Sequence, residues 1–126
     1  MEPLLRTQAL TKKFHQVVAI DSVSFDVRPG EIHCLLGENG AGKSTLAECI
    51  YGFYQPEQGE IFVEGDPVQM SSPAEAIGRG IGMVHQHFVL VPTLSVLENI
   101  VVGTHTSGIL LDLGRAEKEV KLLCER

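Results

Sequence analysis

The chain has 126 residues, of which 44% are hydrophobic and 21% are charged. This length and composition predict one folded domain or part of one, with a real core and no intrinsic disorder. Ten Lys and Arg against sixteen Asp and Glu give a formal net charge of −6, which argues against a broad basic surface for nucleic acid or anionic lipid.

The N-terminal part of the chain has the patterns of three strands and one helix. Residues 4–10 (LLRTQAL) have the composition of a short strand, and residues 22–27 (SVSFDV) alternate polar and apolar side chains as a half-buried strand does. The run IHCLLG at 32–37 is apolar, which is typical of a strand buried on both faces of a parallel sheet. A short helix is expected over STLAECIYG, ending at Gly52.

The middle of the chain continues the alternation of strand and helix. EIFVEG at 60–65 predicts a further strand, followed by a Gly-Asp-Pro turn. A helix is expected to begin at Ser72-Pro73, with proline in its first turn. IGMVHQ at 81–86 predicts the next strand.

Two helices are expected near the C-terminus. SVLENIVVG at 95–103 has helical spacing, with Ser95 as N-cap and Glu98 three residues further on. The tail GRAEKEVKLLCER places its apolar residues on one face of a helix.

The cysteines and the charge-free stretches bear on the cellular compartment. The three cysteines are far apart and form no CxxC pair, which is typical of free thiols in a reducing compartment. Each of them, Cys34, Cys49 and Cys124, is expected to be a small buried hydrophobic residue. The charge-free stretches are broken by Gly, Pro, His, Gln and Ser, so we expect no membrane span. No charged-then-apolar leader is found, so we expect no signal peptide.

The segment GENGAGKST at 37–45 carries the strongest chemical signal. It fits G-x-x-x-x-G-K-[ST] at Gly37, Gly42, Lys43 and Ser44, with an apolar run before it and a helix pattern after it. Glycines permit backbone angles that side chains forbid, so the loop can turn successive N–H groups inward around a phosphate. Together with the helix N-terminus these amides predict an anion cradle.

Each residue of this loop is a candidate ligand of a nucleotide. We expect Lys43 to reach the β- and γ-phosphates, Ser44 to place its hydroxyl on Mg²⁺, and Thr45 to contact the α-phosphate. The expected nucleotide-binding residues of the loop are Gly37, Glu38, Asn39, Gly40, Ala41, Gly42, Lys43, Ser44 and Thr45.

Longer stretches of the sequence resemble one family. FHQVVAIDSVSFDVRPGEIHCLLGENGAGKSTL, GFYQPEQGEIFVEGDPV and IGMVHQHFVLVPTLSVLENI are similar to the N-terminal part of the ATPase subunit of ATP-binding cassette (ABC) transporters. The resemblance extends from about residue 4 to the end, and the last phrase is most similar to ATPases of sugar and nucleoside importers. P-loop kinases and GTPases lack the two antiparallel strands before the loop and the glutamine segment after it.

The resemblance implies an α/β fold of the P-loop NTPase class. It implies a partial RecA-like core with N-terminal antiparallel β-strands, truncated at the start of the helical subdomain. Residues 1–126 would form the N-terminal portion of a nucleotide-binding domain. Residues from about 1 to 103 would hold the core with the P-loop and Q-loop, and residues 104–126 the start of the helical subdomain.

The resemblance also assigns roles outside the phosphate loop. Phe14 occupies the position of the family's aromatic residue that stacks on adenine, and stacking discriminates poorly between bases. Gln86 occupies the position of the Q-loop glutamine, which contacts Mg²⁺ or the attacking water, so Lys43 and Gln86 are the catalytic candidates and Ser44 and Gln86 the metal candidates. The segment from Phe88 to Thr93 is expected to belong to the transporter-facing surface.

The partners and location follow from the same resemblance. The cofactors are ATP and Mg²⁺, and the partners are a transmembrane permease subunit and a second nucleotide-binding domain in a head-to-tail dimer. No nucleic acid and no direct membrane insertion are expected. The protein would lie in the cytoplasm, peripheral to the inner face of the cell membrane through the permease.

Several family motifs are not found in the 126 residues. ILLD at 109–112 is followed by Leu113 where the general-base glutamate would stand, and TSG at 106–108 lacks the second glycine and the glutamine of an LSGGQ signature. Neither an Asp-Glu strand nor a switch histidine follows. Without the Asp-Glu strand beside it, IHCLLG is expected to expose an apolar edge.

Three functions stay open from the sequence alone. The chain is part of an ATPase that powers import, a module that binds nucleotide without hydrolysis, or a member of another P-loop class such as a small kinase. We expect the isolated chain to bind MgATP and to be catalytically incomplete, because phosphoryl transfer needs an activated water as well as a phosphate clamp.

Overall fold

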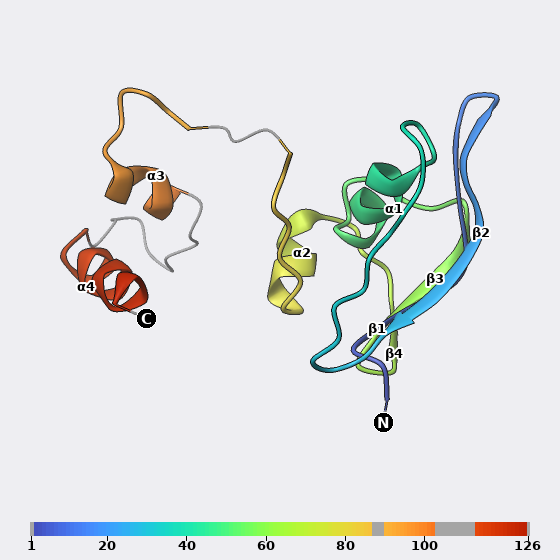
Figure 1. Ribbon diagram of the computed structural model, residues 1–126, viewed down its shortest axis with the longest axis horizontal. Coiled ribbons are helices and arrows are strands. Elements are labelled where there is room, and N and C mark those ends of the chain that lie inside the picture. The colour runs from blue at the N-terminus through green and yellow to red at the C-terminus, as the bar shows by residue number, and fades with distance from the viewer. Residues whose placement is uncertain (1, 87–89, 103–112, 126) are drawn as a thin grey trace. The chain divides into compact units, whose positions relative to one another are not determined.

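The computed structural model describes residues 2–86, 90–102 and 113–125 (Figure 1). The chain divides into two compact units, Met1–Val84 and His85–Arg126. The first unit contains all the strands among the described residues and the first two helices, α1 and α2. The second unit contains α3 and α4.

The first unit is built on an antiparallel sheet with the strand order β2-β1-β3-β4. Its strands are β1 (Leu5–Phe14), β2 (Val17–Val27), β3 (Gln58–Val63) and β4 (Asp66–Val68). The first two form a long hairpin, so the expected pair of N-terminal antiparallel strands is confirmed, and both are longer than their sequence patterns indicate. β4 stands where the sequence predicts only a turn.

Two helices of the first unit pack against this sheet. They are α1 (Lys43–Ile50) and α2 (Pro73–Gly78) (Figure 1). The core consists of apolar side chains from the strands, the two helices and the segment before α2, and its buried members are Leu10, Ile20, Leu46, Cys49, Ile50, Ile61, Met70 and Ala76. Burial of these side chains fixes α1, and therefore the start of α1, on the sheet.

The helix ends agree with their sequence signals. The Ser72 hydroxyl accepts a hydrogen bond from the Glu75 backbone N–H (3.3 Å), with Pro73 next in the chain, as expected for the start of α2. The second unit contains α3 (Val96–Val102) and α4 (Leu113–Cys124), which pack against each other. Ser95 and Glu98 bond reciprocally at the start of α3, with 2.7 Å from the Ser95 N–H to the carboxylate, so the predicted capping box is confirmed.

The predicted strands at 32–37 and 81–86 are wrong. Residues 31–38 and 81–86 belong to no strand or helix. A strand needs a hydrogen-bonding neighbour, and the four described strands pair only among themselves. Ile32 and Leu36 are consequently 91% and 93% exposed, and Val84 is 84% exposed. The expected apolar exposure of IHCLLG is therefore confirmed.

The cysteines correct another expectation. All three are free, as predicted, but only Cys49 is buried, while Cys34 and Cys124 are exposed. Cys34 lies in the unpaired apolar segment, and Cys124 lies on α4, which has no buried residues. Burial in the core raises the pKa of the Cys49 thiol to about 11, so this thiol stays protonated at neutral pH.

Membrane insertion was also expected to be absent. Among the described residues, no helix combines the length and the apolar character that a membrane crossing requires.

An ion pair joins the end of β1 to the segment between α1 and β3. The Lys12 ammonium lies 2.7 Å from the Glu57 carboxylate, which also accepts the Lys13 backbone N–H at 2.7 Å. The Glu57 N–H donates to the Thr11 carbonyl at 2.9 Å. The hydrogen bond from Lys12, followed by that from the Lys13 backbone, lowers the pKa of Glu57 below its ordinary 4.5.

This pair predicts an acid dependence of stability. A carboxyl group with a lowered folded-state pKa stabilises the fold above its unfolded pKa, and this contribution is lost as the pH falls through the folded pKa. Glu57→Gln is therefore expected to lower the urea midpoint of the first unit at pH 7 and to leave it close to wild type near pH 3. Glu60→Gln, on the exposed surface of β3, is the control. A Glu57→Gln deficit that is equally large at both pH values would contradict this assignment.

Candidate phosphate-binding site

The glycine loop enters α1 through left-handed backbone angles. Gly40 and Gly42 have φ values of 85° and 89°, which are unfavourable for residues with a Cβ atom. Gly42 is the N-cap of α1, and its carbonyl accepts the first bond of the helix, from the Leu46 N–H at 2.9 Å. Gly40 and Gly42 therefore have the conformational role that the sequence predicts, whereas Gly37 does not have a left-handed backbone.

The start of α1 presents backbone donors. No side chain among the described residues caps the first turn, whose N–H groups belong to Lys43, Ser44 and Thr45. These groups carry the partial positive charge of the helix N-terminus. Together with the exposed loop residues Asn39 and Gly40 they form a surface suited to an anion.

The Lys43 ammonium folds back into the loop. Its Nζ donates to the carbonyls of Gly37 and Glu38 at 2.7 and 2.8 Å. The side chain therefore lies along the inner side of the loop, and its position brings a full positive charge to the anion-binding amides. A phosphate oxygen is a stronger acceptor for an ammonium than a neutral carbonyl is, so Lys43 fits a phosphate ligand.

Gly42 is also seated against β2. A Cβ atom at this position would lie 2.1 Å from the Ala19 carbonyl oxygen and 2.8 Å from the Ile20 Cγ2 atom. No such contact limits Gly40, where a Cβ atom would meet nothing within 4 Å. The close approach of Gly42 thus docks the phosphate loop onto the sheet.

The geometry of the loop fits a polyphosphate and a hard cation. Unbonded helix amides, left-handed glycines and an inward ammonium suit a polyphosphate. Ser44 is exposed on the first turn of α1, where its hydroxyl is available to a hard cation, and Thr45 is half-buried beside it. Lys43, Ser44 and the first-turn amides are therefore neighbours at the start of α1.

Phe14 lies at the end of β1, close to this loop along the sheet. Phe14 pairs with Val17 of β2. Gly42 packs against Ala19, which lies two positions after Val17 on the same strand. At about 3.3 Å per strand residue, this separation is about 7 Å along the strand. The half-buried Phe14 is therefore paired with a strand residue two positions from the one against which the loop is seated, and its stacking role stays a prediction.

Gln86 belongs to the second unit and is exposed. Its predicted role toward Mg²⁺ and water therefore stays a prediction. Of the predicted transporter-facing segment, Leu90 and Val91 are 70% and 40% exposed, whereas Phe88 lies outside the described residues.

The Asn99 side chain organises the segment that follows Gln86. Its Oδ1 accepts the Val91 N–H at 2.9 Å. Its Nδ2 is 3.2, 3.1 and 3.0 Å from the carbonyls of Val91, Leu94 and Ser95. One amide on α3 therefore fixes the turn before this helix.

Sequence reasoning missed residues in both units. In the second unit, Asn99 stands in the phrase that carried the family resemblance, but its spacing alone does not indicate its partners. Lys12 and Tyr54 both lie beside Phe14, with the Lys12 Nζ 5.2 Å from the centre of the Phe14 ring and the ring centres of Phe14 and Tyr54 4.9 Å apart. The aromatic pattern FYQP could have drawn attention to Tyr54.

A protein-family model described as ABC transporter matches residues 20–125. The chain belongs to the ABC transporter family. Two similar curated proteins are the guanosine import ATP-binding protein NupO of Bacillus subtilis and the ribose import ATP-binding protein RbsA 1 of Rubrobacter xylanophilus. Each is 48% identical over 100% of this chain, covering 25% and 26% of its own length. This ABC family chain therefore spans about a quarter of these relatives.

Solved structures agree with the family assignment. A nucleotide-free ATP-binding cassette from an ABC transporter has a TM-score of 0.80 at 32% identity, covering 98% of this chain and 53% of that one. The ADP conformation of an ATP-binding cassette gives 0.80 at 31% identity with the same coverage. These neighbours confirm the P-loop NTPase fold class with N-terminal antiparallel strands in this ABC family chain.

Two alanine substitutions separate the backbone strain of the loop from its contact with the sheet. Gly40→Ala is expected to cost about 1–2 kcal/mol, because it meets only the left-handed backbone. Gly42→Ala is expected to cost about 2–4 kcal/mol, because the new methyl group also overlaps the Ala19 carbonyl. Urea unfolding measures both. Equal losses would show that Gly42 does not dock the loop on β2.

Proposed function

We propose that the chain binds MgATP through residues 37–45, as the N-terminal part of the ATPase subunit that powers an ABC importer. The observation that carries this proposal is the docked loop itself. Gly42 enters α1 in a left-handed conformation against β2, and the Lys43 ammonium lies inside the loop. This arrangement places amides and a cation around one anion.

The residues of the loop divide the binding of ATP among them. The amides of residues 39–45 bond the phosphate oxygens, and Lys43 exchanges its two carbonyl partners for the β- and γ-phosphates. Ser44 would hold Mg²⁺ through its hydroxyl oxygen, and the ion would supply positive charge that offsets the charge of the phosphates. Thr45 bonds the α-phosphate, and Phe14 stacks on the adenine.

Gln86 takes the catalytic position in this proposal. Its carboxamide oxygen is a suitable ligand for Mg²⁺ or an acceptor for the attacking water. Within its own unit Gln86 is exposed and precedes the turn that Asn99 fixes, so its carboxamide is accessible to a ligand.

The names of the relatives support the proposed cargo, and the proposed partners are those that the family resemblance implies. Their names include guanosine import and ribose import, which supports a nucleoside or sugar as cargo. Powering import requires a transmembrane permease, and completing the ATP site requires a second nucleotide-binding domain in a head-to-tail dimer. The protein then acts at the inner face of the membrane, in the cytoplasm.

The roles of Lys43 and Ser44 are separable by mutation. Lys43→Ala is expected to weaken MgATP binding about tenfold to a hundredfold, because a charged hydrogen-bond donor is lost. Ser44→Ala is expected to reduce the Mg²⁺ dependence of binding more than the affinity for ATP without Mg²⁺. Titration calorimetry with and without Mg²⁺ measures both. Wild-type Mg²⁺ dependence in Ser44→Ala would contradict the assignment of the metal ligand.

The base contact makes a prediction about specificity. Phe14→Ala is expected to weaken ATP and GTP by similar factors, because stacking uses the face of a base and not its hydrogen-bonding edge. Competition binding with both nucleotides measures the two factors. A loss confined to ATP would place the adenine contact elsewhere.

Turnover distinguishes an ATPase from a module that only binds nucleotide. We expect no phosphate release above background from the 126 residues alone, because a phosphate clamp stabilises the ground state without activating water. Phosphate release by wild type is compared with Lys43→Ala, which corrects for contaminating ATPases. Release that Lys43→Ala abolishes would show that Gln86, or a group that the proposal does not name, activates water in the isolated chain.

A further inference from the structure

Phe14 does not stand alone at the end of β1. Its ring lies edge-to-face with that of Tyr54, with 4.9 Å between ring centres and 79° between ring planes. Such pairs contribute stabilisation beyond their buried area and define the relative orientation of the rings. Tyr54 is 38% exposed and Phe14 is half-buried, so both rings are partly accessible.

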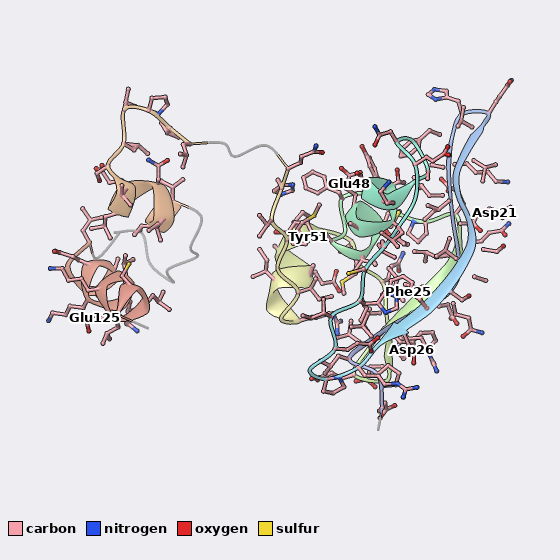
Figure 2. The ribbon with its side chains drawn as sticks, in the orientation of Figure 1. Asp21, Phe25, Asp26, Glu48, Tyr51 and Glu125 are labelled. Atoms are coloured by element: carbon pink, nitrogen blue, oxygen red, sulfur yellow. The ribbon has the colours of Figure 1, made fainter. Side chains whose placement is uncertain are left out.

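Tyr54 is attached to the helix that begins at the phosphate loop. The N–H groups of Phe53 and Tyr54 both donate to the Glu48 carbonyl, at 2.8 and 3.3 Å. Glu48 lies on α1, where Figure 2 labels it. α1 therefore carries the phosphate-binding amides at its N-terminus and anchors the Tyr54 backbone near its C-terminus. The helix is fixed in the core by Leu46, Cys49 and Ile50.

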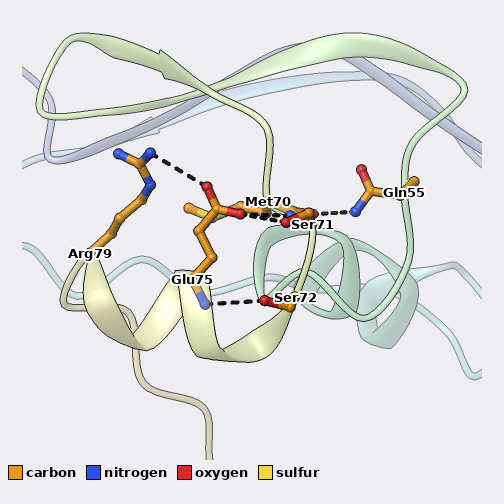
Figure 3. Close-up of polar contacts among 6 residues, drawn as sticks. All are labelled: Gln55, Met70, Ser71, Ser72, Glu75 and Arg79. Carbon is orange, nitrogen blue, oxygen red and sulfur yellow. Dashed lines mark hydrogen bonds and ion pairs between the residues drawn. The ribbon is translucent and has the colours of Figure 1, made fainter.

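The residues after Tyr54 are fixed on two further sides. The Gln55 side chain donates to the Met70 carbonyl, as Figure 3 shows. The Gln55 carbonyl accepts the Lys12 ammonium at 2.8 Å, and the same ammonium bonds Glu57 at 2.7 Å. Tyr54 thus lies in a segment that is hydrogen-bonded to α1, to β1 and to Met70.

Lys12 completes the cluster around Phe14. Its Nζ lies 5.2 Å from the centre of the Phe14 ring, within the range of a cation–π contact. Its side chain is 13% exposed, and its two oxygen partners restrict where the ammonium can lie. Phe14 is therefore oriented by the Tyr54 ring and the Lys12 ammonium. A backbone hydrogen bond to α1 fixes the main chain of Tyr54, and two oxygen partners hold the ammonium.

We propose that Tyr54 is a positioning residue for the nucleotide base. It holds the Phe14 ring in the orientation in which a base stacks, at a distance from the phosphate loop set by α1. This inference rests on the proposed stacking role of Phe14. The physical basis is preorganisation, because a ring that already occupies one rotamer loses less conformational entropy when a base is added.

The experiment compares two probes that share the phosphate site. MgATP engages both the loop and the base contact, whereas magnesium tripolyphosphate engages the loop alone. Tyr54→Leu is expected to weaken MgATP binding about three- to tenfold and to leave tripolyphosphate binding unchanged. Tyr54→Phe keeps the edge-to-face contact and is expected to retain wild-type affinity for both probes.

A matched control comes from the neighbouring aromatic residue. Phe53 lies in the same segment, with its ring centre 6.2 Å from that of Tyr51, and is 56% exposed. Phe53→Leu removes a more exposed aromatic ring from the same segment and keeps the Phe14–Tyr54 pair, so it is expected to bind both probes as wild type does.

The outcomes separate this inference from the function on which it rests. Wild-type MgATP affinity in Tyr54→Leu, with Phe14→Ala impaired, overturns the positioning role and leaves the stacking role intact. Wild-type MgATP affinity in Phe14→Ala overturns both. An equal loss of MgATP and tripolyphosphate in Tyr54→Leu shows that Tyr54 supports the loop and not the base, and also overturns the inference.

Discussion

The contact between Gly42 and the backbone of β2 is the constraint on which the candidate site depends. A Cβ atom at Gly42 would lie 2.1 Å from the Ala19 carbonyl oxygen, so only glycine permits this approach. The approach sets the start of α1 against the sheet. The first-turn N–H groups have no partner within the helix, so they stay available to a ligand. Lys43 then adds its charge from the next position in the chain.

The same contact relates the phosphate loop to the base surface. Ala19 lies on the hairpin whose end carries Phe14, and α1 anchors the segment that carries Tyr54. Two routes through the structure, one along β2 and one along α1, therefore fix the aromatic pair relative to the loop. A nucleotide bound by both surfaces needs such a fixed spacing, because its own phosphate chain is flexible.

How far the sequence predicts this structure depends on the range of the interactions involved. The phosphate loop, the start of α2 at Ser72-Pro73 and the capping box of α3 are local, so their residue spacing predicts them. The strands expected at 32–37 and 81–86 depend on neighbours, and an apolar pattern does not supply a partner strand. β4 was missed because Pro67 obscured a hairpin whose turn residues, Glu64 and Gly65, have φ values of 51° and 87°. The contacts of Lys12 and Tyr54 join segments about forty positions apart, and no local pattern reveals them.

The most direct test of the account is the response of the backbone amides to nucleotide. Addition of MgATP to the ¹⁵N-labelled protein is expected to shift the amide resonances of residues 39–45 more than those of any strand, because these groups bond the phosphates. Saturable binding that leaves the resonances of Gly40 to Thr45 unmoved would show that the nucleotide binds elsewhere, and it would contradict the central claim.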